Sequence, residues 1–409
     1  MRLARFVLLA GLIGVHVGSI GAQPADPLRL RLGDPDRRDK SAAVVLDGIT
    51  QAATGEIIDP SELATRLQKV RVLLIGETHT NREDHRVQLQ VLRALVATNR
   101  PVVLALEMLP YTQQAVLDQW QKADMDELTF VRRVGWFEHW GFHWGYYRDL
   151  FLFARDHRLP LVGINVPADF TSKIRQRGLG ALTPEEAERL PPSGVDTSDR
   201  EHLAFLKATV GDADGAHGQM NEETWQRMLT AQATWDATFA WQATRASERA
   251  GPDAIVVVLV GSGHVAYDLG IVRQARRWSQ IGIASLVPVP TRSAAGEPID
   301  AVRASYADYV WGVPGESAET FPMLGITTRE NQSGNRVVSG ITPNSPAALA
   351  GLQAGDTIVK MDGRALTDRY DVNLVMMLKQ WGDAVRLVVV RGTTERTFVV
   401  HLRRRSLKP

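Results

Sequence analysis

Four apolar stretches of this chain run directly into side chains that can transfer protons or bind a metal ion. The sequences at these points are GETH, ALEM, GIN and GSGH, which supply Glu77, His79, Glu107, Asn165 and His264. Carboxylates and imidazoles exchange protons near neutral pH, and they also bind divalent ions that lower the pKa of water. We therefore predict Glu77, His79, Glu107 and His264 as catalytic residues. Glu77, His79 and His264 are also possible ligands of Mn²⁺, Co²⁺ or Zn²⁺.

The elements that would position these residues are short runs of apolar, often β-branched residues, separated by amphipathic stretches. The runs are residues 70–75, 102–106, 161–166, 255–260 and 284–287. Nearly continuous apolar strands that alternate with helices are typical of a parallel sheet buried on both faces. Functional sites of such sheets lie beyond the carboxyl ends of the strands. We therefore predict an α/β domain over residues 45–310, with these polar side chains meeting at one rim.

Residues from about 168 to 250 show no convincing strand pattern and are predicted to form a mainly helical subdomain within this domain. At the helical period, the apolar residues between Trp225 and Phe239 share one face, and Gln232 and Asp236 fall near its centre. A carboxylate that faces a core needs a hydrogen-bonding or charged partner. Asp236 would therefore pair with a strand-end residue, or else accept a hydrogen bond from a loop amide.

An aromatic stretch precedes that subdomain. The helical period places Tyr147 on a buried stripe together with Trp140 and Trp144. A buried tyrosine beside tryptophans usually belongs to the core and satisfies its hydroxyl there. The alternative is that the flat rings form the wall of a binding site.

The composition excludes several classes of protein. Of the 409 residues, 44% are hydrophobic and 23% are charged, which excludes a disordered or coiled-coil chain and leaves room for two or three domains. The formal net charge is +1, so we expect no nucleic-acid partner. The chain has no cysteine, which excludes disulfides, thiolate metal sites and attachment of lipid to a cysteine. Any cofactor must be held by His, Tyr, Asp or Glu.

The first 22 residues have the features of a secretory signal peptide. Arg2 and Arg5 precede an apolar run over residues 6–17, and small residues follow up to Ala22. The run is shorter than the roughly 20 residues that span a bilayer, so an uncleaved anchor is the weaker interpretation. We therefore expect a soluble periplasmic or extracytoplasmic protein that is not a cysteine-anchored lipoprotein.

The carboxyl-terminal part has a different pattern. Residues 311–322 are rich in Gly, Pro and Ser and are predicted to form a linker. Residues 323–405 contain MLGI and SPAALAGLQAGD and resemble a small β-rich PDZ domain of the kind attached to bacterial periplasmic proteases. The resemblance implies that a peptide or protein C-terminus adds as a strand beside the MLGI segment. The residues that would bind it are Leu324, Gly325, Ile326, Val372 and Val375.

Several motifs of the larger domain together resemble those of the ChaN-type haem-binding uptake proteins of the Tiki superfamily. They are GETHTNREDH, ALEM, WGFHWGYYRDL, INVP, AQATWD and GSGHVAY. The resemblance implies a parallel α/β domain with a mainly helical subdomain. It also implies haem bound at an interface with tyrosine as an iron ligand, and a homodimer around the haem is one arrangement that would form such an interface. The superfamily also includes metal-dependent proteases and other hydrolases.

The family's functional residues fall on particular positions of this sequence. The superfamily acid and base correspond to Glu77 and His79, while the second-strand carboxylate and late histidine correspond to Glu107 and His264. The iron-binding tyrosine falls on Tyr147, with Tyr146 as competitor, and His217 would face the haem. Asn165, Gln232 and Asp236 complete the predicted cofactor site. His143 stands where the family pattern has an acidic residue.

Three functions follow from these observations. The first is haem or iron binding in iron uptake or haem handling. The second is hydrolysis, either with a divalent metal or with His79 as general base oriented by Glu107. The third is a non-enzymatic periplasmic adaptor that works through the PDZ-like groove.

Overall fold

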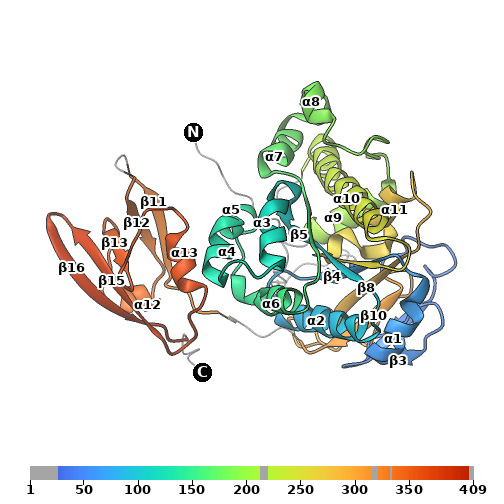
Figure 1. Ribbon diagram of the computed structural model, residues 1–409, viewed down its shortest axis with the longest axis horizontal. Helices are drawn as coiled ribbons and strands as arrows, with labels where there is room; N and C mark the ends of the chain where they lie inside the picture. The colour runs from blue at the N-terminus through green and yellow to red at the C-terminus, as the bar shows by residue number, and fades with distance from the viewer. Residues whose placement is uncertain (1–25, 212–219, 316–320, 332–333, 405–409) are drawn as a thin grey trace, which may run out of the picture. The chain divides into compact units, whose positions relative to one another are not determined.

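The computed structural model describes residues 26–211, 220–315, 321–331 and 334–404 (Figure 1). The predicted signal peptide and His217 lie outside these residues. The chain forms two compact units, and each is described by itself. Unit 1 comprises Met1–Met125 and Asp149–Glu316, and unit 2 comprises Asp126–Arg148 and Ser317–Pro409.

Unit 1 is built on an eight-stranded sheet with the order β3-β2-β10-β8-β4-β7-β5-β6. The strands are β2 (Ile49–Gln51), β3 (Ile57–Ile58), β4 (Val72–Glu77), β5 (Val102–Pro110), β6 (Leu161–Asn165), β7 (Ile255–Gly261), β8 (Ile283–Pro290) and β10 (Tyr309–Val313). The strands from β10 to β6 in this order are parallel, and β2 and β3 pair antiparallel at one edge. All residues of β4, β5 and β7 are buried. The predicted α/β class with a parallel sheet is therefore confirmed.

The five predicted strands of this sheet are present, but several further strands were not predicted. One is β10, which extends three residues into the segment predicted as a linker, so that Trp311, Gly312 and Val313 are buried. Gly312 within the strand and Pro314 directly after it concealed a strand whose position is fixed by pairing with β8. A separate two-stranded sheet joins β1 (Ser41–Ala43) to β9 (Ala301–Arg303).

Helices and short turns connect the strands of the sheet in unit 1. They are α1 (Pro60–Arg66), α2 (Arg82–Ala97), α3 (Gln114–Gln121), α6 (Arg148–Asp156), α7 (Ala168–Arg177), α8 (Pro184–Ala187), α9 (Arg200–Gly211), α10 (Glu222–Ala250) and α11 (Ile271–Ala275), with 3-10 turns η1 (Leu67–Lys69), η2 (Tyr111–Gln113), η4 (Leu179–Ala181), η5 (Ser262–His264) and η6 (Ala266–Asp268). Between β6 and β7, the described residues form helices and turns and no strand. Helix α10 packs against α7, α9 and α11 and against the strands β5, β6 and β7 (Figure 1).

Unit 2 contains an antiparallel sheet with the order β11-β12-β13-β15-β16, and β14 pairs with β13. Its elements are α4 (Glu127–Arg133), α5 (Trp136–His139), η3 (Trp144–Tyr146), β11 (Ile326–Glu330), β12 (Arg336–Ile341), α12 (Pro346–Leu349), β13 (Thr357–Met361), β14 (Arg364–Ala365), α13 (Asp371–Met376), β15 (Ala384–Arg391) and β16 (Thr394–His401). Apolar side chains of the sheet, α12 and α13 form its core. The predicted small β-rich PDZ domain is confirmed. No helix in the described ranges is long and apolar enough to cross a membrane.

Candidate functional site

The carboxyl end of β4 carries the first part of a polar cluster. Glu77, the last residue of β4, has a fully buried side chain, and its Oε1 lies 2.9 Å from Nδ1 of His79. The amide nitrogen of Gln88, from α2, donates a 2.6 Å hydrogen bond to the other carboxylate oxygen. Both oxygens of Glu77 are therefore fixed, and the carboxylate sets the orientation of the His79 imidazole.

A second part of the cluster combines β5, α10 and η5. Glu107 Oε2 accepts a 2.6 Å hydrogen bond from the backbone nitrogen of Gly261, and its Oε1 lies 3.4 Å from Nε2 of His264. Nδ1 of the same imidazole lies 2.7 Å from Oδ1 of Asp236. His264 is therefore held between two carboxylates that come from a strand and from a helix.

Gly261 joins the two parts. A Cβ atom at this position would lie 3.0 Å from the ring of His79 and 3.7 Å from Glu107. A side chain at this position would crowd the His79 ring, so glycine suits the close approach of the end of β7 to both groups. Glu77, His79, Glu107 and His264 thus lie together at one rim of the sheet, beyond the carboxyl ends of parallel strands.

The carboxylates change the protonation of both imidazoles. Burial alone would lower the pKa of His264, but the charges of Asp236 and Glu107 outweigh burial and raise it to about 10. Burial would likewise lower the pKa of His79, but its hydrogen bond to Glu77 and the charge of Glu107 raise the pKa above its ordinary value. Near neutral pH, His264 is therefore an imidazolium that donates from both nitrogens.

This charge state bears on the predicted metal site. A histidine ligates a metal through a neutral nitrogen, so a protonated imidazole must first release its proton. Within the described ranges, no group of three or more His, Asp or Glu side chains is arranged to hold a metal ion. The prediction that Glu77, His79 and His264 are metal ligands gains no support from this geometry.

The remaining predicted residues of the rim make structural hydrogen bonds. Asn165 donates from its side chain to the carbonyl of Glu107 at 2.8 Å and accepts from the Val166 nitrogen. The side-chain nitrogen of Gln232 lies 2.9 Å from Nδ1 of His264, a position where the flipped amide would present its oxygen to the imidazolium. The predicted pairing of His79 with Glu107 as its orienting carboxylate is wrong, because Glu77 is the group hydrogen-bonded to His79.

Three buried residues of this cluster were not predicted. His85 and Gln88 lie on α2, where Nδ1 of His85 is 3.0 Å from the Gln88 oxygen and 3.6 Å from Glu77. Their spacing of three residues, close behind the GETH motif, could have indicated a shared helical face. His202 lies on α9, with Nε2 3.8 Å from Asp236 Oδ2. No sequence pattern indicates His202, because only the fold brings α9 to α10.

The predicted haem tyrosines lie in unit 2. Tyr147 has no exposed surface, and its ring packs at centroid distances of 5.2 Å from Trp136 and 6.1 Å from Trp140. Tyr146 is only half-buried and contacts the ring of Phe321. The continuous helix assumed for this stretch is absent, because Gly141 has a φ of 85° between α5 and η3. Tyr146 is therefore the more accessible phenol.

His143 begins the turn that carries both tyrosines. Its Nδ1 accepts a 3.0 Å hydrogen bond from the Gly145 nitrogen, which caps η3. Burial lowers the pKa of His143 to about 4, so the imidazole is neutral near pH 7. His143, which stands where the family pattern has an acidic residue, thus has a structural role: its neutral ring nitrogen accepts the capping hydrogen bond.

The predicted peptide-binding residues lie at the first strand of the PDZ sheet and on α13. Leu324 is buried, and its carbonyl accepts from the Ala347 nitrogen at 3.0 Å. Gly325 has a φ of 76°, and a Cβ there would lie 2.1 Å from Ser345, so only glycine fits. Ile326 begins β11, an edge strand within the described residues. Val372 and Val375 are half-buried against the domain core.

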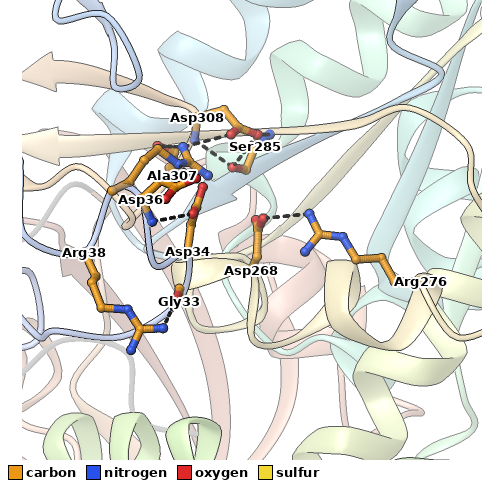
Figure 2. A network of polar contacts seen from close by, with 10 residues as sticks. Gly33, Asp34, Asp36, Arg38, Asp268, Arg276, Ser285, Ala307 and Asp308 are labelled. Carbon is orange, nitrogen blue, oxygen red and sulfur yellow. Dashed lines mark hydrogen bonds and ion pairs between the residues drawn. The ribbon is translucent and has the colours of Figure 1, made fainter.

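A cavity of about 710 Å³ in unit 1 lies away from this cluster. Its walls include five arginines and five acidic residues, namely Arg37, Arg200, Arg273, Arg276, Arg277, Asp34, Asp196, Asp199, Glu201 and Asp268. Figure 2 shows part of the network, in which Asp268 reaches Arg276 at 3.3 Å. None of Glu77, His79, Glu107 or His264 lines this cavity. Most of its charges are already paired with one another, which is typical of a structural network.

Two family models match the chain. A model described as haem-binding uptake, Tiki superfamily, ChaN matches residues 63–275, which is just over half of the chain. A PDZ domain model matches residues 322–402. A solved structure of cofacial heme binding to ChaN of Campylobacter jejuni is 20% identical, with a TM-score of 0.52 over 66% of this chain and 96% of that chain. At this identity the likeness shows a shared fold.

Curated relatives match shorter segments. The magnetosome formation protease MamE of Paramagnetospirillum magneticum is 46% identical over 63 residues, which are 15% of this chain and 9% of MamE. The regulator of sigma-E protease RseP of Escherichia coli is 41% identical over 69 residues, which are 17% of this chain and 15% of RseP. The matched segments are thus small parts of these two proteases.

Proposed function

Because this chain belongs to the haem-binding uptake family of the Tiki superfamily, typified by ChaN, we propose that it binds haem and serves haem handling or iron uptake. The observation that supports a site in this chain is a half-buried phenol, Tyr146, within a cluster of aromatic rings. A phenolate oxygen is a known protein ligand of haem iron. The chain offers no thiolate alternative because it has no cysteine.

The aromatic segment fits a porphyrin in its chemistry. Trp140 and Phe142 are half-buried, and their rings pack 5.3 Å apart at an angle of 60°. Such rings offer apolar surface to a flat ligand. The bound haem would supply a ferric iron, and the phenolate oxygen of Tyr146 would be its ligand. Tyr147 would support this site through its packing on Trp136, because a fully buried phenol cannot reach an iron in this conformation.

The proposal is tested by adding hemin to the full chain and recording the Soret band. We expect saturable binding in the wild type and a weakened or shifted band in Tyr146→Phe, because the variant lacks the ligand oxygen. Tyr147→Phe should bind hemin with nearly the same spectrum. Tyr370→Phe is the matched control, since this tyrosine is half-buried like Tyr146 but belongs to the PDZ domain. An unchanged spectrum in Tyr146→Phe would exclude this residue as ligand, and a change in Tyr147→Phe alone would assign the other phenol.

We further propose that the chain acts outside the cytoplasm and that its PDZ domain docks a peptide or protein C-terminus. The amino-terminal sequence supports export, and the edge position of β11 supports strand addition by a peptide. A homodimer would let two chains share the haem. Cell fractionation tests the location, and light scattering with and without hemin tests the dimer. A mass that stays at one chain on saturation with hemin would exclude sharing.

A second candidate function is hydrolysis by the rim cluster. It is supported by the two carboxylate–imidazole pairs, Glu77 with His79 and Asp236 with His264, which flank Glu107. Protonated imidazoles are suited to act as general acids toward a leaving group, while a carboxylate takes up a proton. Unstructured peptides, incubated with and without Mn²⁺, Co²⁺ or Zn²⁺, test this function. Cleavage that is lost in Glu77→Gln would support it, and cleavage indifferent to that change would contradict it.

A further inference from the structure

A second cavity in unit 1 lies at the amino ends of β5 and β6, so that the strands separate it from the rim cluster at their carboxyl ends. It has a volume of about 550 Å³, within the range of roughly 300–1,000 Å³ that is typical of small-molecule sites. We propose that this cavity binds a single-chain amphiphile that carries one carboxylate, such as a medium-chain fatty acid. The proposal goes beyond haem binding and uses none of the residues assigned to haem.

The walls of the cavity are mainly apolar. They come from the end of α2, the starts of β5 and β6, the turn before β6 and the last turns of α10. The apolar lining residues are Val96, Pro101, Val102, Val103, Leu159, Pro160, Val162, Ala246 and Ala250. Such walls favour a ligand with a hydrocarbon body, because burying apolar surface stabilises binding by about 25 cal/mol per Å².

The charged residues of the lining all have the same sign. Arg100, Arg158 and Arg249 line the cavity, and no acidic side chain does. This composition differs from that of the 710 Å³ cavity, where arginines and carboxylates are equal in number. The positive group of a cationic or zwitterionic ligand would find no counter-charge among these lining residues. An anionic head group would find several cations in a chain whose overall net charge is only +1.

The three arginines differ in how their donors are used. Arg100 is held rigidly, because its guanidinium donates to the carbonyls of Leu67, Val70, Asp253 and Ala254 at distances of 2.6–3.1 Å. These carbonyls account for its position without a ligand. Its charge still contributes to the potential in the cavity.

Arg158 and Arg249 are exposed at the mouth, and no ion pair or side-chain hydrogen bond is found for either among the described residues. Arg249 lies in the last turn of α10, where the helix dipole favours a cation without occupying its donors. Guanidinium groups bind carboxylates through paired, charge-assisted hydrogen bonds. The two free guanidinium groups thus supply the head-group site, and the apolar walls supply the site for the chain.

Isothermal titration calorimetry of the full-length protein with decanoate tests the proposal. We expect saturable binding with a stoichiometry of one, and affinity that falls as salt rises. The double variant Arg158→Gln/Arg249→Gln should bind at least about tenfold more weakly, because it loses the charge-assisted bonds. Arg245→Gln is the matched control: this arginine lies one turn earlier on α10, stacks on Trp241 and does not line the cavity. Circular dichroism and hemin binding should be unchanged in all variants.

Other ligands separate the possible outcomes. Acetate should bind far more weakly than decanoate because it lacks the hydrocarbon chain, and decyltrimethylammonium should not bind because it carries the wrong charge. Equal binding of that cation, or unchanged decanoate affinity in the double variant, would overturn the proposal. Binding to anionic phospholipid vesicles without binding of decanoate would instead indicate a membrane surface and would also overturn it. Displacement of decanoate by hemin would place haem in this cavity and contradict the separation of the two sites.

Discussion

Nδ1 of His264 lies 2.7 Å from Oδ1 of Asp236, a carboxylate with no exposed surface in the middle of α10. The pair ties the longest helix of unit 1 to the turn that follows β7. A buried charge is costly unless a partner of opposite charge compensates for it. The stability of this unit should therefore depend on keeping His264 protonated.

The first prediction concerns the pH dependence of that stability. The folded pKa of His264 is about 10 and the unfolded value is about 6.5. The stabilisation is therefore fully present below pH 6.5 and is lost as the pH rises toward 10. Asp236→Asn should lower the free energy of unfolding by about 3 kcal/mol at pH 6, and the difference from wild type should shrink by pH 9.5. Urea denaturation of both proteins at pH 6 and pH 9.5 measures this difference in the free energy of unfolding.

Glu248→Gln provides the control for this experiment. Glu248 lies on the same helix, is exposed and forms no side-chain interaction among the described residues. Its substitution should change the free energy of unfolding by less than about 0.5 kcal/mol at either pH. An Asp236→Asn effect that is equal at pH 6 and pH 9.5 would show that His264 is not ionised in the folded protein.

The rim cluster shows which parts of the site are predictable from the sequence. The rule that sites lie beyond the ends of parallel strands identified Glu77, Glu107 and His264, because each lies at or within a few residues of the end of an apolar run. The helical period identified Asp236, since one helix carries its whole pattern. His202 was not predicted, because its contact with Asp236 depends on how two helices pack, and no local sequence pattern indicates that packing.

The aromatic segment shows what the sequence did not predict. The helical period placed Tyr147 on a buried stripe, and the ring is fully buried. The assumed reason, a continuous helix, is wrong because the left-handed Gly141 separates α5 from η3. That break leaves the neighbouring Tyr146 half-buried. The accessibility of the two phenols therefore follows from a backbone conformation that the residue types alone do not fix. Likewise, β10 was recognisable only through its pairing with β8.

The second prediction concerns the glycine that follows the GSGH turn. A Cβ at Gly270 would lie 2.4 Å from the carbonyl oxygen of His264 and 2.8 Å from Oδ1 of Asp236. The backbone cannot yield as a flexible side chain would, so Gly270→Ala should destabilise the protein by about 2 kcal/mol or more. Gly263→Ala, within the turn itself, should be nearly neutral because no atom lies within 4 Å of its Cβ position. Thermal unfolding of both variants tests this, and equal midpoints would contradict it.

The third prediction concerns Asp268 in the network of Figure 2. Burial and the charge of Asp308 raise the pKa of Asp268 to about 6, although Arg276 lies 3.3 Å away. A carboxyl group whose pKa is higher in the folded than in the unfolded state destabilises the folded protein once it ionises. The free energy of unfolding therefore falls as the pH rises from the unfolded pKa of about 3.8 to the folded pKa of about 6. Asp268→Asn should therefore stabilise the protein by about 1–3 kcal/mol at pH 8 and have little effect at pH 3.5.

A neighbouring carboxylate gives a contrast of opposite sign for this test. Asp34 accepts a hydrogen bond from the Asp36 nitrogen and pairs with Arg37 at 2.8 Å, and these contacts lower its pKa. Asp34→Asn should therefore destabilise the protein at pH 8, where Asp268→Asn stabilises it. Urea midpoints of both variants measure the effects. A loss of stability in Asp268→Asn at pH 8 would show that its ion pair with Arg276 dominates.

The fourth prediction concerns the PDZ domain. Arg391 makes two parallel hydrogen bonds of 2.7 and 2.8 Å to Asp356, whose side chain is completely buried. The hydrogen bonds from Arg391 hold the pKa of Asp356 below its ordinary value. Arg391→Met leaves this carboxylate without its cation and its two hydrogen bonds, which should lower the free energy of unfolding by about 1–3 kcal/mol. Arg386→Met is the control, because Arg386 is exposed on the same strand and its side chain forms no ion pair among the described residues.

Hydrogen exchange followed by mass spectrometry resolves this effect from the stability of unit 1. In Arg391→Met, the amides of β12, β13 and β15 should exchange faster, because these strands share the core that Asp356 adjoins. Amides of β4 and β7 should exchange as in the wild type. The difference should narrow as the pH falls, because Asp356 then takes up a proton and no longer needs the guanidinium. Unchanged exchange of the PDZ strands at neutral pH would show that water compensates for the lost cation.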